Sequence, residues 1–383
     1  MGLIRIFTGR NLTWVWCLLS ATVIAIPSLF FVPDLNMDAT VYFNAMNTFR
    51  KYFSFGDLYK FITATPTILR EYKSYPGATF LLYIISKTGL YTLLSFITVT
   101  LSYFSVLTAV SSFFESKKTY GYIFTQLISL FTIHYLFSMS VVRFYLAVAL
   151  LLIVTFVVIK KSSRKYIILF TIPALVHPGI IPPMVLVLGS MLFRKVSNKV
   201  MYFLIITIPF LFSAGSLIQK LNVNGYVGIQ IGKLMRYVNK SDLVTMFTTT
   251  KTWTIEAIVV IYLLLFIFAV QINKNRINNL DIQKKRMINV AYYFSAFTIG
   301  ISPFNIIFIR YMAIAIPFTL AGFSILLSNK NIKGKNVIFS TLILIVIISI
   351  LSNSDISYVT FSVRPIKALG MPLFETIKLI TKY

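Results

Sequence analysis

The chain has 383 residues, of which 57% are hydrophobic and only 12% are charged. Soluble domains carry about 25% charged residues, so this composition excludes an ordinary water-soluble globule. The formal net charge is +26. The basic residues lie between apolar stretches rather than in one tail or on one face, which argues against a nucleic-acid partner. The chain is therefore expected to be embedded in membrane lipid.

Apolar stretches recur from end to end, and a helix of about 20 such residues crosses a hydrocarbon core about 30 Å thick. We predict spans near residues 12–32, 91–114, 120–137, 143–159, 166–177, 179–193, 200–218, 253–272, 287–302, 308–328 and 336–352. The pieces 166–177 and 179–193 are short, and they could form one broken helix or two tilted or re-entrant ones. The expected fold is an all-α polytopic integral membrane protein with about 11 transmembrane helices. We expect a single membrane domain over residues 1–383.

The basic residues of the short connections predict the orientation, because Lys and Arg are enriched in cytoplasmic loops. With the N-terminus in the cytoplasm, the cytoplasmic connections hold Arg5, Arg10, Lys117, Lys118, Lys160, Lys161, Arg164, Lys165, Arg194, Lys195, Lys199, Lys274, Arg276, Lys284, Lys285, Arg286, Lys330, Lys333 and Lys335. The other side then holds three long segments, 33–90, 219–252 and 353–383. We predict that these are periplasmic, that the C-terminus lies with them, and that they carry the function.

The first long segment is expected to contain helices of its own. Apolar side chains recur in it at helical spacing, at Tyr42, Met46, Phe49, Tyr52 and Phe53. This spacing predicts an amphipathic helix that lies on the membrane surface. Residues 79–86 look like a short apolar helix that leads into the second span.

Fingerprints for nucleotide binding are absent, and so is any Cys or His cluster with metal-ligand spacing. Nucleotide-driven pumping is therefore not supported. The chain has two histidines, His134 and His177. His134 falls inside the third predicted span and is interpreted as a packed residue.

Three ionisable residues are expected at the outer ends of spans, where charges tend to mark a substrate path or a paired site. Arg143 opens the fourth span and Arg310 begins the tenth. A guanidinium group stays charged there and offers a planar fork to phosphate oxygens. Each arginine could instead reach the lipid headgroups or pair with a structural carboxylate. His177, followed by Pro178 and Gly179, is expected at an outer turn, where its ring could bond phosphate, a sugar hydroxyl or a free carbonyl.

The long segments add charges of both signs. The first supplies carboxylates at Asp34, Asp38, Asp57 and Glu71. The second is cationic, with Lys220, Lys233, Arg236 and Lys240 against Asp242. A cationic loop over outward-facing arginines suits a large anionic headgroup such as a lipid-linked pyrophosphate. Each single basic residue could equally be solvated or bound to lipid phosphate.

The order of these residues resembles the EpsG-like and Wzy-type polysaccharide polymerases over most of residues 30–320. The resemblance is carried by Asp38-x-x-x-Tyr42, Tyr75-Pro76-Gly77, Val142-Arg143, His177 and Arg310-Tyr311. Two positions depart from the family pattern. The family often has Arg-Gln where this chain has Arg143-Phe144, and a Glu before the proline where it has Tyr75; Glu71 lies close enough to substitute.

The resemblance implies an O-antigen or capsule polymerase with a glycosyltransferase-C-like membrane fold in the bacterial inner membrane. It also implies that no nucleotide sugar, no other cofactor and no metal ion is needed. Such an enzyme joins undecaprenyl-diphosphate-linked repeat units at the periplasmic face, with membrane lipids around it and with a flippase and a chain-length regulator of the same pathway as possible partners. On this hypothesis Arg143 and Arg310 bind the donor diphosphate, helped by Arg236 or Lys233, and His177 orients the diphosphate or the acceptor. Asp38 is the expected acceptor-binding residue or general base, with Glu71 as its rival.

Two other functions fit the same sequence. A flippase for lipid-linked glycans would also have about a dozen helices and internal cations, but its charges would be spread along a cavity that reaches both faces. Here they cluster at one side, which favours an enzyme. Another lipid-dependent glycosyltransferase or an O-antigen ligase would differ only in its acceptor.

Overall fold

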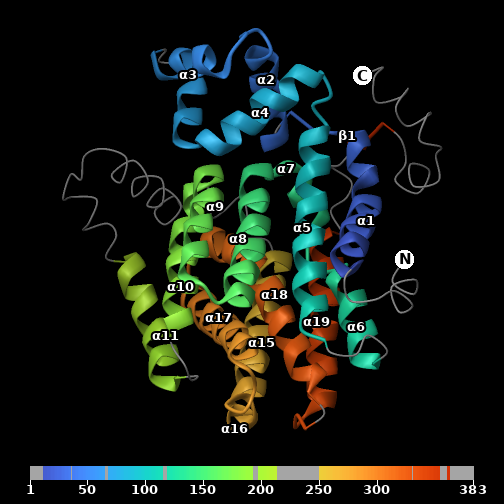
Figure 1. Cartoon of the computed structure of the whole chain (residues 1–383), viewed down its shortest axis with the longest axis vertical. Coiled ribbons are helices and arrows are strands. Elements are labelled where there is room, and N and C mark those ends of the chain that lie inside the picture. The colour runs from blue at the N-terminus through green and yellow to red at the C-terminus, as the bar shows by residue number, and fades with distance from the viewer. Residues whose placement is uncertain are drawn as a thin grey trace.

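The structure is a computed structural model that describes residues 12–35, 37–64, 68–114, 119–192, 197–213, 250–329, 331–353 and 360–362. Its main body is a bundle of helices. These are α1 (Thr13–Ala25), α5 (Leu93–Ser112), α6 (Tyr120–Ser129), α7 (Tyr135–Ser140), α8 (Val142–Lys161), α9 (Thr171–Val176), α10 (Ile181–Leu192), α11 (Asn198–Ser213), α15 (Thr250–Ile272), α17 (Ile282–Gly300), α18 (Asn305–Ser328) and α19 (Lys335–Asn353). Four further elements, α2 (Asp38–Phe49), α3 (Phe55–Ala64), the 3-10 helix η4 (Ile68–Ser74) and α4 (Pro76–Thr88), lie across one end of the bundle (Figure 1). We call these four elements the cap.

Six helices of the described chain are long and apolar enough to cross a membrane: Thr13–Phe30, Leu93–Ser112, Val142–Lys161, Thr252–Ile272, Ile307–Ser328 and Lys335–Ser352. Three shorter apolar helices, Lys165–Val176, Pro178–Met191 and Asn198–Phe210, stand beside them. A helix of 20 residues such as α5 is about 30 Å long, the thickness of the hydrocarbon core. The chain is therefore an all-α, multi-pass membrane protein.

The predicted third span is wrong in one respect, because residues 120–137 do not form one helix. The α6 helix ends at Ser129, and α7 starts at Tyr135. His134 lies in the break, not inside a helix: its Nδ1 accepts a hydrogen bond from Phe137 N, 3.3 Å away, and caps α7. Its Nε2 lies 2.9 Å from the carbonyl oxygen of Ser352. The histidine thus stabilises an interruption that hydropathy alone did not reveal.

The structure separates the two short pieces between residues 166 and 193. The chain rises through the 3-10 helix η5 (Arg164–Phe170) and α9, turns through η6 (Pro178–Ile180), and returns in α10. The turn has a local cause, since Pro178 cannot donate the hydrogen bond that would continue α9. His177 directly follows Val176, the last residue of α9.

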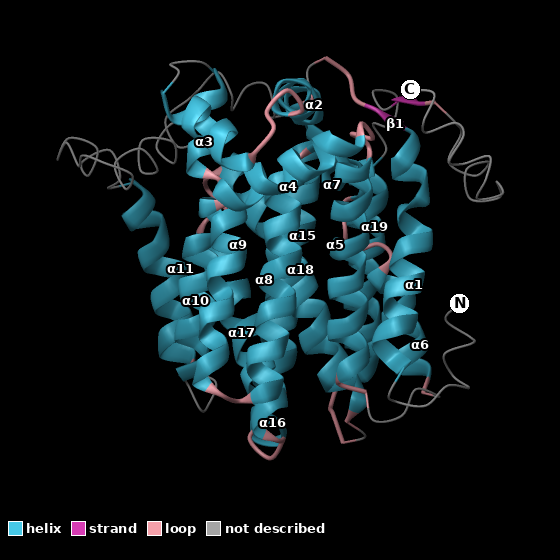
Figure 2. Cartoon of the chain, turned by 45° about the horizontal axis from the view of Figure 1, so that its top comes forward, coloured by secondary structure: helices cyan, strands magenta, loops and turns pink. Residues whose placement is uncertain are grey.

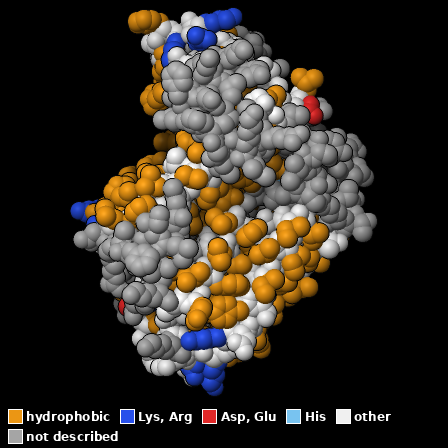
Figure 3. Space-filling view, turned by 90° about the vertical axis from the view of Figure 1, so that its right-hand side faces the viewer, with side chains coloured by type: hydrophobic (Ala, Val, Ile, Leu, Met, Phe, Trp, Pro, Cys, Tyr) orange, Lys and Arg blue, Asp and Glu red, His pale blue; other side chains and the backbone are white. Residues whose placement is uncertain are grey.

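Packing is densest around α18 and sparsest at the rim of the bundle. In the membrane-crossing part of α18, 89% of the residues are buried, against 33% in α1 and 28% in α19. Figure 3 shows hydrophobic side chains in a broad band, with Lys and Arg at its two ends. Such an apolar surface would be unfavourable in water, and it is what lipid tails require.

The two ends of the bundle differ in charge. The end away from the cap, where α16 (Lys274–Ile277) lies (Figure 2), holds many basic residues and one described acid, Asp281. At the cap end, β1 (Phe31–Val32) pairs antiparallel with β2 (Thr360–Phe361). This pairing places residues 360–362 beside the start of the first long segment, so that these two regions share one end of the molecule.

The cap contains the two helices predicted in the first long segment, but α2 ends at Phe49 and turns its apolar face into the cap rather than toward a membrane surface. Tyr42, Met46 and Phe49 are buried on one face of α2, against α4 and η4, whereas Phe53 lies beyond the helix and is exposed. The α4 helix starts with Pro76 in its first turn and ends at Gly89, whose φ of 75° closes the helix. The cap is therefore a packed layer with its own apolar interior.

Candidate functional site

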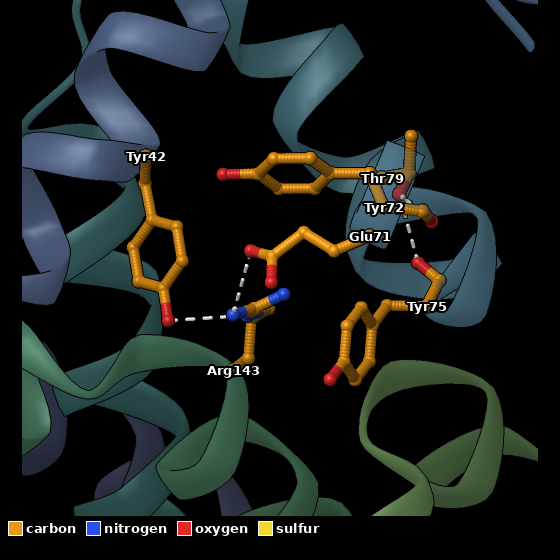
Figure 4. A network of polar contacts seen from close by, with 6 residues as sticks. All are labelled: Tyr42, Glu71, Tyr72, Tyr75, Thr79 and Arg143. Carbon is orange, nitrogen blue, oxygen red and sulfur yellow. Dashed lines mark hydrogen bonds and ion pairs between the residues drawn. The ribbon is translucent and has the colours of Figure 1, made fainter. Parts of the chain in front are cut away.

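Arg143 lies where the bundle meets the cap. It is the second residue of α8, and α7 ends three residues before it at Ser140. This sharp corner leaves the side chain beneath the cap rather than inside the bundle, as Figure 4 shows. The Arg143 side chain is 16% exposed, so it is largely withdrawn from water.

Three tyrosine rings surround this guanidinium group (Figure 4). Its carbon Cζ lies 5.0 Å from the ring centre of Tyr42, 5.5 Å from that of Tyr72 and 4.3 Å from that of Tyr75. Arg143 Nε donates a hydrogen bond to the hydroxyl oxygen of Tyr42, 3.1 Å away. The negative ring faces stabilise the cation, each by about 0.5–2 kcal/mol depending on desolvation.

Glu71 supplies the opposite charge. Its Oε1 lies 3.6 Å from Arg143 Nη2, and its side chain is 38% exposed. Charge-assisted hydrogen bonds are typically about 2.7–2.9 Å long, so this ion pair is loose. A competing anion could displace the carboxylate without unfolding the site.

Two polar groups in this cluster are buried and have no hydrogen-bond partner among the described residues: Arg143 Nη1 and the hydroxyl of Tyr72. Burial raises the pKa of Tyr42 to about 12 against the opposing effect of Arg143, and burial also raises the pKa of Tyr72. Both tyrosines therefore stay neutral donors near pH 7. Unsatisfied buried donors cost about 1–3 kcal/mol each, and an acceptor-rich ligand would relieve that cost.

The local fold of η4 and α4 sets the tyrosines in place. Thr79 Oγ1 donates to the carbonyl oxygens of Tyr72, at 2.8 Å, and Tyr75, at 3.0 Å (Figure 4). At Gly77, an added Cβ would lie 3.1 Å from the backbone of Leu175. The close approach of α4 to α9 thus favours a residue without a side chain at this position.

This approach brings His177 to the cluster. Its ring centre lies 5.8 Å from that of Tyr75 and 5.7 Å from that of Phe144, the residue after Arg143. Its Nδ1 accepts a hydrogen bond from Gly179 N at 3.1 Å. A neutral ring bonded this way carries its proton on Nε2, which suits a donor to phosphate or sugar.

The other predicted site residues lie around this cluster or outside the described chain. Asp38 is exposed at the start of α2, one turn before Tyr42, whose pKa its charge helps to raise. Arg310 is half-buried on α18, and the hydroxyl of the next residue, Tyr311, donates to Gly179 O at 3.4 Å. Arg236 and Lys233 lie outside the described residues.

Sequence reasoning missed two groups. Tyr72 was not singled out, although it directly follows Glu71; its contact with Arg143 joins residues far apart in the sequence. Glu256 was passed over inside the predicted span 253–272, although an acid within an apolar run is itself a signal. Within the described residues, no three or more His, Cys, Asp or Glu side chains form a group that could hold a metal ion.

No known protein family, curated protein or solved structure matches this chain. The resemblance to polysaccharide polymerases consequently stays a prediction, and the site itself carries the functional argument.

Proposed function

We propose that this chain is a polymerase of O-antigen or another surface polysaccharide, which joins undecaprenyl-diphosphate-linked repeat units. The observation that carries the proposal is the Arg143 cluster, a buried cation at one end of a membrane bundle with a free Nη1 and a loosely held counter-ion. A fixed guanidinium fork matches the oxygens of a diphosphate and stabilises the charge that develops as the anomeric bond breaks.

The residues divide into two roles in this proposal. Arg143 binds the donor diphosphate, and Arg310, with Arg236 or Lys233, extends the cationic surface. Glu71, displaced from Arg143 by the diphosphate, takes the proton of the acceptor hydroxyl while that oxygen bonds to the anomeric carbon and the diphosphate leaves. Asp38, the base expected from the sequence, becomes the rival to Glu71, because Glu71 and not Asp38 pairs with Arg143. His177 orients the diphosphate or the acceptor.

The wider arrangement follows from the same proposal. The chain crosses the bacterial inner membrane about 11 times in a glycosyltransferase-C-like fold. The basic end of the bundle faces the cytoplasm and the cap faces the periplasm. The lipid-linked glycan would reach the cluster from the outer leaflet, in a pathway that includes a flippase and a chain-length regulator.

The direct test is polymerisation of synthetic undecaprenyl-diphosphate repeat units by purified protein in vesicles, with products sized on a gel. Arg143→Ala should lower the rate at least ~100-fold, because preorganised charge at a developing anion is worth about 2.7–4 kcal/mol. Arg70→Ala is the matched control, since Arg70 is an exposed arginine of the cap next to Glu71.

Two results would contradict the proposal: no elongation by the wild-type chain, or full elongation by a folded Arg143→Ala variant. Transport of intact lipid-linked units across the vesicle, without elongation, would instead identify a flippase. Transfer to a different acceptor would identify a ligase or another lipid-dependent glycosyltransferase.

A further inference from the structure

Glu256 is the one acidic residue within the six membrane-crossing helices of the described chain. Its side chain is 7% exposed, and its Oε1 is buried with no hydrogen-bond partner among the described residues. An isolated carboxylate in such surroundings costs many times more free energy than a neutral carboxylic acid. The Arg143 cluster does not use this residue.

Glu256 lies only a short distance inside the cap-side boundary of the membrane. Trp253, three residues earlier on α15, is 60% exposed, and tryptophan is typical of the boundary between hydrocarbon and water. Three residues of helix place Glu256 about 4.5 Å deeper. It shares a helix face with the buried residues Val259, Leu263 and Phe266. The carboxyl group is therefore inside the bundle, yet close to the aqueous phase at the cap end.

Among the described residues, no charged group on the helices packed against α15 pairs with Glu256. The α15 helix packs against α17, α18, α19 and the short α16. Toward the end of the bundle away from the cap, the charged or titratable residues of these four helices are Lys274, Arg276, Lys284, Lys285, Arg286, Tyr292, Tyr293 and Lys335. At the cap end they are Arg310 and Tyr311, both on α18; the Tyr311 hydroxyl donates to Gly179 O.

Helix register shows why Arg310 does not neutralise Glu256. Tyr262 OH lies 2.8 Å from Thr319 Oγ1, so these two residues of α15 and α18 lie at the same level in the bundle. At about 1.5 Å per residue, Arg310 is then about one helical turn closer to the cap than Glu256. Arg310 precedes Thr319 by nine residues, which is half a turn out of phase, so it lies on the face of α18 away from α15. Within the part of the chain that the structure describes, Glu256 therefore has no counter-ion on these packed helices.

We propose that Glu256 is a proton-binding site at the cap end of the bundle. Its own side chain carries the proton and is a neutral carboxylic acid within the membrane-spanning part of α15. The proton exchanges with the solution on the cap side, one helical turn away. This site is independent of the polymerase proposal and stands even if that proposal fails.

Carbodiimide labelling of the full-length protein in detergent tests this directly. The acid O–H adds to dicyclohexylcarbodiimide: the proton goes to one nitrogen and the carboxyl oxygen bonds to the carbon. The acyl group then migrates to nitrogen and leaves a stable N-acylurea, which mass spectrometry locates. A charged, water-soluble carbodiimide serves as the second reagent, because it reaches only carboxyl groups in contact with water.

We expect the apolar reagent to label Glu256 and the water-soluble reagent to label Glu71 and Asp38 but not Glu256. Labelling of Glu256 should fall about tenfold per pH unit above its midpoint, because only the protonated acid reacts. Glu256→Gln should remove the adduct, and Glu71→Gln should leave it. No adduct on folded wild-type protein at acidic pH, equal labelling by both reagents, or labelling independent of pH would each overturn the proposal.

Discussion

The bundle and the cap are both helical, but they satisfy their polar side chains in different ways. In the bundle, most serine and threonine hydroxyl groups of the described chain bond to a carbonyl three or four residues earlier in their own helix. Bonds between helices, such as that of Tyr262 with Thr319, are fewer. Thr98 Oγ1 donates to Leu94 O at 2.9 Å, and Ser129 Oγ donates to Thr125 O at 2.8 Å. Such bonds satisfy each side chain without linking one helix to another. The bundle is therefore held mainly by apolar packing.

In the cap, polar contacts join segments that are far apart in the sequence. Arg143 bonds to Tyr42, 101 residues away. Tyr83 OH donates to Phe53 O at 2.6 Å, and Lys87 Nζ donates to the carbonyl oxygens of Arg50 and Tyr52. A substitution in the bundle should thus change overall stability, whereas one in the cap should change the position of the cap and the chemistry at Arg143.

The largest effect is expected in the bundle, at Gly322 of α18. An added Cβ would lie 2.7 Å from the buried ring of Phe266 and 3.2 Å from Ala291 Cβ. Gly322→Val should lower the free energy of unfolding in detergent by about 3 kcal/mol through overpacking. Gly189→Val is the control, because a Cβ there meets nothing within 4 Å, and its stability should change by less than about 0.5 kcal/mol. Equal losses in both variants would contradict the packing account.

The next effect is the response of the cap to alkaline pH. Burial raises the pKa of Tyr42 to about 12, whereas a tyrosine in the unfolded chain titrates near 10. The contribution of the protonated Tyr42 hydroxyl to the free energy of unfolding is complete below about pH 10. It falls as the pH rises from 10 to 12, because the unfolded chain loses its proton first. The total loss is at most about 2.7 kcal/mol. Denaturant titrations near pH 9 and pH 12 should show the loss, and Tyr42→Phe should reduce it.

Tyr72→Phe separates structure from function within the cap. Since the Tyr72 hydroxyl is buried without a partner, its removal should leave stability unchanged or raise it by about 1 kcal/mol. If the hydroxyl donates to a bound diphosphate or sugar, elongation should fall about tenfold, the worth of one such bond. Thermal unfolding and the elongation assay on the same preparation measure both. A less stable variant with full activity would assign the hydroxyl to the fold alone.

The smallest effect is expected at Lys87, whose ammonium group caps the carbonyls after α2. Lys87→Met keeps the apolar stem but removes these bonds, and exposure limits the cost to about 0.5 kcal/mol. Faster proteolysis between α2 and α3 would report the loss. Unchanged proteolysis would mean that apolar packing alone holds α2 on α4.

The sequence by itself determined the membrane class, the alternation of loops between two ends, and the helices near residues 42–49 and 79–86. These features depend on local composition, because a helix in lipid satisfies its own backbone and needs only a sufficiently long apolar run. Arg143, Glu71 and His177 were also identified in advance, since ionisable residues stand out against an apolar background.

Tertiary structure decided which of these residues meet. The break at His134 depends on a carbonyl of Ser352, far along the chain, which no local pattern contains. Tyr72 and Tyr75 belong to the site because the cap folds over the start of α8. Glu256 matters because packing on α15 buries its Oε1 without a partner among the described residues. Charge and hydropathy are properties of single residues, but desolvation and pairing exist only once distant segments come together.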